Sequence, residues 1–215
     1  MKKNLNKKAL SAAGLGAALL LSATFAYFTD RANYSEDITG AKFGITLTAE
    51  SDNSTVIMPD HARAFNYTVE STGTVDADIR ERVMVYGQDG DQYLPVNADT
   101  QEFGLYNEED NADLYTKKTV GKEAVLYENT RELKAGQNYT QNGNIKLNAS
   151  ATNVYSDGNY TIAILVEAKQ KGASEWTTVA AEEINMAGEN KADMQDTLNK
   201  VNAVAKGQEL KVGGN

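Results

Sequence analysis

Apolar and polar residues alternate along several stretches of the chain, which is the periodicity of a β-strand with one buried face. Successive side chains of a strand point to opposite sides, so the apolar members of each stretch share one face. Ile145 and Leu147 repeat this pattern weakly, and Glu81 interrupts one of the strong rows. The strong apolar rows are Phe43, Ile45, Leu47 and Ala49; Phe65, Tyr67 and Val69; Val75, Ala77, Ile79, Val83 and Val85; and Tyr160, Ile162, Ile164 and Val166.

Turn-forming dipeptides punctuate the alternating runs. Thr72-Gly73, Asn142-Gly143 and Asp157-Gly158 each adjoin such a run. These pairs favour tight turns, because glycine adopts positive φ without strain and Asn or Asp tolerates it. Short strands separated by turns predict an all-β fold, an antiparallel β-sandwich of jelly-roll type. We expect this sandwich to be one domain that spans residues 40–186.

Two regions depart from the alternation. Residues 97–121 are polar and acidic, and we expect an insertion there that contains a small helix. Residues 187–215 are expected to form a short helix and a tail, with Asn190 as the helix N-cap and Gly207 as its end. Residues 174–188 fit a strand or a helix equally well. The helix prediction rests on apolar residues at helical spacing, which are Met194, Leu198, Val201 and Ala205.

Residues 1–26 have the pattern of a secretory signal peptide. Lysines cluster within the first eight residues, and an uncharged apolar run follows to about Phe28. Thr24 and Ala26 supply the small residues expected at the third and first positions before the cut. Cleavage is therefore predicted between Ala26 and Tyr27. The alternative is an uncleaved membrane anchor, because the apolar run is about long enough to cross a bilayer.

The charge and the lack of cysteine narrow the possible functions. The chain has 21 basic and 30 acidic residues, and removing residues 1–26 takes away four lysines and no acid, which leaves 17 against 30, a formal charge of −13. Such a protein repels nucleic acid and anionic lipid, so we expect no nucleic-acid partner and membrane contact only before the signal is cleaved. Without cysteine, disulfides, thiol catalysis and zinc–thiolate sites are excluded.

The sequence lacks the residue patterns that catalysis and cofactor binding require. His61 is the only histidine, so the two-histidine HExxH zinc motif cannot form, and no GxSxG motif offers a serine nucleophile. His61 follows Pro59-Asp60 in a turn-like stretch, where we expect a solvated loop histidine. Asp89, Asp91 and the acidic residues 108–113 do not follow the EF-hand pattern. We therefore expect no catalytic, cofactor-binding or metal site, and no enzymatic activity.

The residues around the predicted cleavage site resemble those of a known family of exported proteins. The run Thr24-Phe25-Ala26-Tyr27-Phe28-Thr29-Asp30 resembles the junction that the signal peptidase SipW cuts in the family of the biofilm fibre protein TasA and camelysin. The resemblance covers about residues 1–86 and 159–177. The glycine of the family's Pro-Gly-Asp is missing here, and the middle of the chain matches nothing in the family. Looser matches are Met58-Pro59-Asp60, Glu70-Ser71-Thr72-Gly73, Ala77-Asp78-Ile79-Arg80 and Glu167-Ala168-Lys169-Gln170.

The resemblance implies a jelly-roll sandwich and export through a signal peptidase of SipW type. It further implies secretion to the extracellular matrix or cell surface of a Gram-positive-type bacterium. The segment freed by cleavage, residues 27–39, would become a strand donated to another copy, with Tyr27, Phe28 and Tyr34 buried there. By composition alone this segment is a flexible terminus. An open sheet edge can accept such a strand, because its backbone N–H and C=O groups lack partners.

These observations predict a secreted structural subunit of a biofilm matrix fibre, which assembles with copies of itself. One alternative is a monomeric secreted or surface binding module that uses the loops of the sandwich. The least favoured alternative is a camelysin-like peptidase, because the chain has one histidine and no metal motif.

Overall fold

The computed structural model describes residues 44–51, 61–96, 103–106, 115–155, 158–185, 190–191 and 193–211. The predicted signal peptide and the segment 27–39 lie outside the described residues, and so do Thr24, Ala26, Tyr27, Phe28 and Tyr34. Cleavage and strand donation therefore stay predictions. None of the described helices has the length and hydrophobicity of a membrane span.

The described residues form mostly β-strands, and every strand pair is antiparallel. A single turn of 3-10 helix covers Asn153–Tyr155, and one α-helix, α2, covers Met194–Ala205. The strands are β1 (Ile45–Ser51), β2 (Arg63–Ser71), β3 (Ala77–Asp89), β4 (Gln92–Tyr93), β5 (Phe103–Tyr106), β6 (Lys117–Val120), β7 (Ala124–Leu133), β8 (Asn138–Leu147), β9 (Asn159–Gln170), β10 (Thr177–Asn185) and β11 (Asn190–Lys191).

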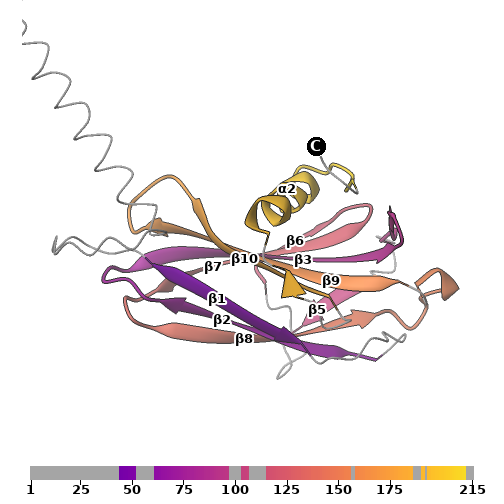
Figure 1. Cartoon of the computed structure of the whole chain (residues 1–215), viewed down its shortest axis with the longest axis horizontal. Coiled ribbons are helices and arrows are strands. Elements are labelled where there is room, and N and C mark those ends of the chain that lie inside the picture. The colour runs from indigo at the N-terminus through magenta and orange to yellow at the C-terminus, as the bar shows by residue number, and fades with distance from the viewer. Residues whose placement is uncertain are drawn as a thin grey trace, which may run out of the picture.

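The strands form two sheets that lie face to face (Figure 1). The smaller sheet has the order β1-β2-β8-β5. The larger sheet has the order β11-β10-β9-β3-β7-β6, and β4 pairs with the end of β3. This arrangement confirms the predicted all-β fold with antiparallel sheets, a sandwich-like architecture with one short helix near the C-terminus.

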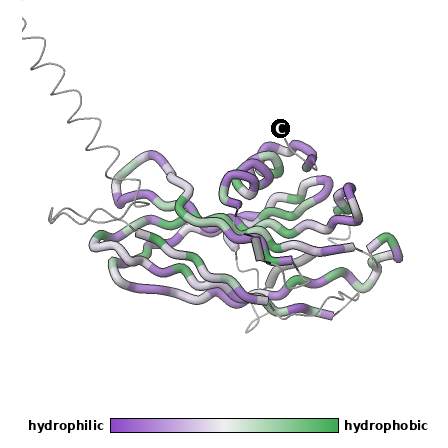
Figure 2. The backbone as a smooth tube through the Cα atoms, viewed as in Figure 1, coloured by the Kyte–Doolittle hydropathy of each residue, from purple (hydrophilic) through white to green (hydrophobic). Residues whose placement is uncertain are grey.

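The apolar rows of the sequence fill the space between the two sheets. Phe65, Tyr67, Ile79, Ile162 and Ile164 are at most 2% exposed and belong to one continuous core. Figure 2 shows hydrophobic positions concentrated along the strands and hydrophilic positions at the turns. Each such side chain stabilises the fold by about 1.5–3 kcal/mol on burial. The strands therefore have a strongly specified register, because a slip by one residue would expose a whole row.

A second apolar cluster lies between the larger sheet and α2, on the outer face of the sandwich. Ala163 and Leu165 of β9 pack there against Val201 and Val204 of the helix. Figure 1 shows α2 lying across this face. β9 is therefore buried on both sides, which explains why the residues between its inward-pointing members are apolar too.

The ends of α2 are fixed by its capping residues. Asp193 is the N-cap, and its Oδ1 accepts a hydrogen bond from the backbone N–H of Asp196 at 3.0 Å. The prediction of Asn190 as the cap was wrong, since Asn190 belongs to β11 and the capping carboxylate lies three residues later. Gly207 was predicted correctly as the end: it follows the C-cap and has φ of 70°, a conformation that favours glycine.

Other predictions from local sequence are corrected by strand pairing. The described part of residues 97–121 contains strands β5 and β6 and no helix, because both pair with neighbouring strands. Asn142-Gly143 lies inside β8 rather than in a turn, where Gly143 is opposite Phe65 of β2. A glycine leaves room beside a bulky aromatic side chain, so pairing overrides the turn signal. The ambiguous residues 174–188 contain strand β10.

Candidate functional site

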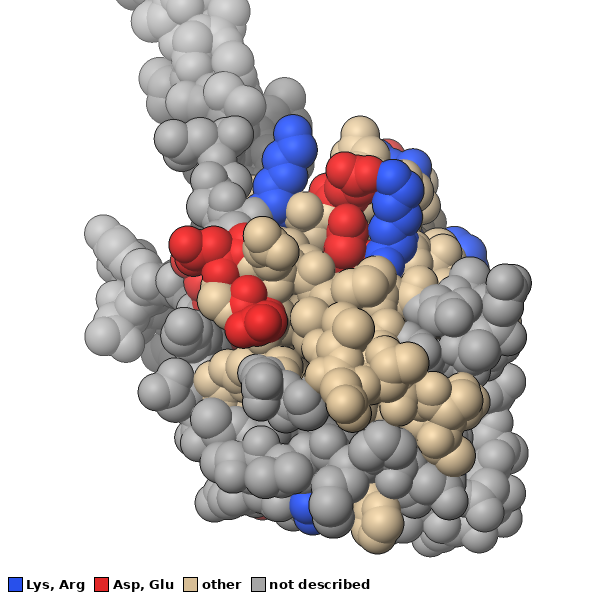
Figure 3. Space-filling model, turned by 90° about the vertical axis from the view of Figure 1, so that its right-hand side faces the viewer, with Lys and Arg blue, Asp and Glu red and all other residues tan. Residues whose placement is uncertain are grey.

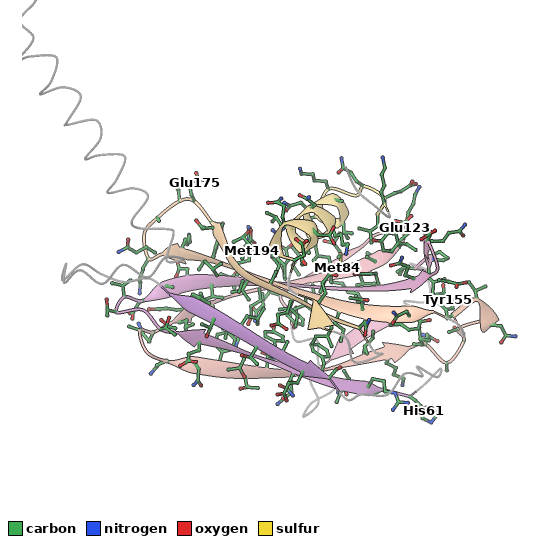
Figure 4. The ribbon with its side chains drawn as sticks, in the orientation of Figure 1. His61, Met84, Glu123, Tyr155, Glu175 and Met194 are labelled. Atoms are coloured by element: carbon green, nitrogen blue, oxygen red, sulfur yellow. The ribbon has the colours of Figure 1, made fainter. Side chains whose placement is uncertain are left out.

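A groove of about 740 Å³ opens where the two sheets meet the start of α2. One wall is β10, another is the first two turns of α2, and Leu47 of β1 closes the third side. Figure 4 shows Met194 at the start of the helix, over the sheet. The groove is lined by Leu47, Thr178, Val179, Ala180, Ala181, Glu182, Asp193, Met194, Gln195 and Leu198. Its walls therefore combine apolar side chains with polar groups, including the carboxylates of Glu182 and Asp193.

The strands beside this groove have open edges. Among the described residues, β1 pairs only with β2, and β10 pairs with β9 on one side and with just two residues of β11 on the other. The outer edge of β10 from Thr177 to Glu182 therefore has no strand partner within the described part of the chain. An edge of this kind offers a row of backbone donors and acceptors to another strand.

The edge strand β1 lacks the usual protection against pairing. Exposed edges are commonly guarded by lysine, proline or a bulge. β1 reads ITLTAES, with no lysine or proline and with Glu50 as its only charged residue. By contrast, the edge strand β6 carries Lys117 and Lys118, and β10 has a register irregularity between Thr178 and Ala180. β1 thus lacks the lysines that β6 carries, as does β5 (FGLY), the strand at the other edge of the smaller sheet.

Glu182 places a carboxylate in the groove. Its side chain is half-buried on β10, and no described residue forms an ion pair or hydrogen bond with it. Burial raises the pKa of Glu182 above its ordinary value. An occupant that supplied a backbone N–H or a cation to this carboxylate would offset the cost of desolvating it.

A second cluster of polar groups lies inside the sandwich, around Glu81 of β3. Glu81 is the charged member of the otherwise apolar row of β3 that points into the sandwich, and it is completely buried. Its Oε2 accepts a hydrogen bond from Nη2 of Arg131, at 3.1 Å, and Arg131 also donates to Gln141 at 2.9 Å. Burial raises the pKa of Glu81, and the Arg131 charge opposes that rise. The ring of Tyr139 lies 4.2 Å from the Arg131 guanidinium.

Tyrosine hydroxyls complete this internal cluster. The hydroxyls of Tyr67 and Tyr115 are hydrogen-bonded at 3.0 Å. Burial, together with the charge of Glu81, raises the pKa of Tyr67, Tyr115 and Tyr139. These tyrosines are therefore neutral hydrogen-bonding groups over the physiological range, and Tyr67 and Tyr115 are buried in the main core.

Two segments that are far apart in the sequence, residues 77–80 and 167–170, lie side by side in the larger sheet. Residues 77–80 of β3 pair directly with residues 167–170 of β9, so that Arg80 is opposite Glu167. Arg80 Nε donates to Glu167 Oε2 at 2.6 Å. The guanidinium of Arg80 and the ammonium of Lys169 each lie 4.9 Å from the centre of the Trp176 ring. These residues form a structural contact between strands, with the geometry of ion pairing and cation–π packing.

The only histidine of the sequence lies away from α2 (Figure 4). His61 is exposed at the entry to β2, and Figure 4 shows it at the edge of the sandwich, remote from α2. No cluster of three or more His, Cys, Asp or Glu that could hold a metal ion is found among the described residues.

Sequence reasoning did not identify the groove. The alternating row did place Leu47 on an inward face, but nothing local indicated that Val179 and Met194 would lie opposite it. The relevant signal was β1 itself, a predicted strand without lysine or proline in its first five residues.

Comparisons with known proteins give no family for the chain. No known family matches it, and no curated protein matches it either. Two solved structures overlap with part of it: AvmM, which catalyses macrocyclization in alchivemycin A biosynthesis, and the ApaA protein of Bordetella pertussis. AvmM is 12% identical, with 70% of this chain and 92% of that chain covered and a TM-score of 0.45. ApaA is 11% identical, with 68% and 94% covered and a TM-score of 0.28. Likenesses this weak carry no argument about function.

Proposed function

We propose that this protein is a secreted structural subunit of an extracellular matrix fibre, and that it assembles by strand donation. In this proposal a signal peptidase of SipW type cuts before Tyr27, and residues 27–39 then pair with an open sheet edge of another copy. The observation that carries the proposal is the groove beside β1 and β10, which combines a strand edge without lysine or proline with the apolar side chains of Leu47, Val179 and Met194.

The groove supports an extended occupant for two reasons. An added strand gains main-chain hydrogen bonds along an open edge, and its alternate side chains enter the adjacent groove. The aliphatic side chains of Leu47, Val179 and Met194 offer apolar surface to such side chains, and burying apolar area contributes about 25 cal/mol per Å². Tyr27, Phe28 and Tyr34 are the large aromatic residues of the proposed donor segment.

The proposal is tested first by removing the donor segment. The exported protein is expected to begin at Tyr27, as measured by its intact mass. This mature form should polymerise into fibres seen by electron microscopy, whereas a version that starts at Gly40 should keep its β-type circular dichroism and lose the fibres. Equal polymerisation of the two forms would contradict strand donation.

A matched pair of variants tests the acceptor edge. Leu47→Lys puts a charge into the groove, while Thr48→Lys puts the same charge on the neighbouring residue, which is exposed on the opposite face of β1. Because inward-pointing charges block edge pairing, Leu47→Lys should abolish fibres and Thr48→Lys should leave them. Inhibition by both variants alike would point to a general charge effect rather than to this groove. A mature protein that stays monomeric in every salt and pH tested would favour the binding-module alternative.

A further inference from the structure

A smaller cavity of about 170 Å³ lies on the outer face of the larger sheet, beside the first turns of α2. Strand pairing builds its base: Tyr86 of β3 is opposite Thr161 of β9, and Gln88 is opposite Asn159. Asn185 of β10 is opposite Thr161 on the other side. Figure 3 looks at the end of the molecule where β3 and β4 turn, and shows acidic and basic side chains gathered toward the side that carries the helix. All eight residues that line the cavity are polar.

The floor of this cavity is a buried hydrogen-bond network around Glu183. Glu183 is 8% exposed, and its carboxylate accepts hydrogen bonds from Lys200 Nζ at 3.0 Å, Thr197 Oγ1 at 3.2 Å and Tyr86 Oη at 3.3 Å. Lys200 also forms an ion pair with Asp196 at 2.8 Å. Burial and the Glu183 charge raise the pKa of Tyr86 to about 12, so its hydroxyl keeps its proton. These mutual contacts hold the polar groups in place before any ligand arrives.

The charged groups of the cavity disfavour an anionic ligand. Glu183 and Asp196 contribute two negative charges and Lys200 one positive charge, so phosphate or carboxylate ligands are repelled. A divalent cation is disfavoured too, because the Lys200 ammonium already lies within hydrogen-bonding distance of both carboxylates.

The remaining groups select a ligand that is rich in hydroxyls. Gln88, Asn159 and Asn185 each bring a carboxamide, which has both donors and an acceptor. Gln88 Nε2 already donates to the backbone oxygen of Gly90 at 2.7 Å, and the Thr161 hydroxyl is hydrogen-bonded to Tyr86. A partner for such groups must offer donors and acceptors on neighbouring atoms, as the vicinal hydroxyls of a sugar ring do. The volume is below the roughly 300–1,000 Å³ of sites for drug-sized ligands, so only a small molecule or one unit of a polymer fits.

We propose that this cavity binds a single uncharged sugar unit, either a free monosaccharide or the terminal unit of a polysaccharide. The proposal does not depend on fibre formation, since the cavity and the groove have different lining residues. Affinity should be in the millimolar range, because a few hydrogen bonds exchanged with water give a modest net gain.

The test titrates the mature protein, or the version that starts at Gly40 where the mature form polymerises, while heteronuclear NMR follows the cavity resonances. The ligands are glucose, galactose, mannose and N-acetylglucosamine, with glucuronate as the anionic probe. At least one neutral sugar should shift them, and glucuronate should not. Asn159→Ala and Gln88→Ala, both outside the Glu183 network, should each weaken binding by about tenfold. Asn142→Ala, at an exposed site on β8, is the matched control and should leave affinity unchanged.

Two results would overturn the proposal: no response to any neutral sugar, or a response that neither cavity variant weakens. A polysaccharide composed of the preferred sugar then distinguishes the two sources. Co-sedimentation of the protein with this polymer, competed by the monosaccharide, would assign the terminal unit of the polymer as the ligand. Binding of the monosaccharide without co-sedimentation would assign the free sugar.

Discussion

Glu81 and Arg131 form an ion pair in which the carboxylate is completely buried and the guanidinium side chain is 29% exposed, with 3.1 Å between Oε2 and Nη2. The two residues lie on adjacent strands, β3 and β7, between the two sheets. Arg131 thus reaches water while Glu81 does not. The ion pair with Arg131 explains how a carboxylate can occupy an inward position among apolar residues. Burial of this carboxylate removes it from water, and this desolvation raises the pKa of Glu81.

Replacing this carboxylate should stabilise the protein at neutral pH. Because the pKa of Glu81 is raised above its unfolded value, the folded state binds a proton more readily, and its stability falls as pH rises from the unfolded pKa through the folded one. Glu81→Gln keeps the size of the side chain and an oxygen acceptor for Arg131, but it removes the cost of burying a charged carboxylate. Its melting temperature should exceed that of the wild type by a few degrees at neutral pH.

The pH dependence distinguishes this effect from simple repacking. The gain in melting temperature from Glu81→Gln should shrink as pH is lowered through the ordinary pKa of glutamate. Below that pKa, Glu81 is protonated in both the folded and the unfolded state. Glu70→Gln, at an exposed position on β2, serves as the control and should melt like the wild type at each pH. A Glu81→Gln variant that melts below the wild type at neutral pH would mean that the ion pair stabilises more than its desolvation costs.

The core prediction concerns Ile164, in the middle of β9. Ile164→Asp should prevent stable folding, because an unpaired carboxylate there lacks any partner and its burial costs several kcal/mol, against a total stability of about 5–15 kcal/mol. The control is Asn142→Asp, which adds the same charge at an exposed site of the smaller sheet. Circular dichroism and thermal melting give the readout. A cooperative transition in Ile164→Asp near that of the wild type would refute the described register of β9.

The inward rows were predictable from sequence because one-sided burial leaves a period of two. Phe65, Tyr67 and Val69 alternate with less buried residues, and the structure confirms their inward position. In β10 the two faces differ less, because Ala181 packs under α2 while Ile184 enters the main core. Its periodicity was therefore ambiguous.

Features that depend on distant contacts escaped prediction. Gly143 follows an asparagine that signals a turn, yet it lies within β8 because the strand pairs with β2 from Asn138 to Ile145. Glu81 broke the pattern with no local explanation, since its partner Arg131 is fifty positions away in the chain. The groove likewise depends on the docking of α2 against β10, which no local periodicity encodes.

The N-cap of α2 should contribute measurably to stability. Asp193→Ala removes the acceptor for the backbone N–H of Asp196 and should cost about 1 kcal/mol of unfolding free energy. Asp193→Ser retains a capping oxygen and should cost much less. Urea denaturation of both variants measures the difference. Equal stability of Asp193→Ala and the wild type would show that the helix end is held by packing alone.

The buried pair between Glu183 and Lys200 gives the strongest prediction for the outer face of the larger sheet. Lys200→Met removes the cation and leaves Glu183 buried with only hydroxyl donors, from Tyr86 and Thr197. Removing one partner of a buried ion pair costs more stability than the pair itself contributes, because the other charge stays buried without compensation. We therefore expect the free energy of unfolding, measured by urea denaturation, to fall by about 3 kcal/mol.

The double variant Lys200→Met/Glu183→Gln should recover part of that loss, because the uncompensated charge is gone. Lys206→Met, on an exposed lysine at the end of the same helix, is the control and should cost less than about 1 kcal/mol. Should the single and double variants unfold at the same urea concentration, the charge on Glu183 would not be the source of the loss, and the helix would be held on the sheet by Val201 and Val204 alone.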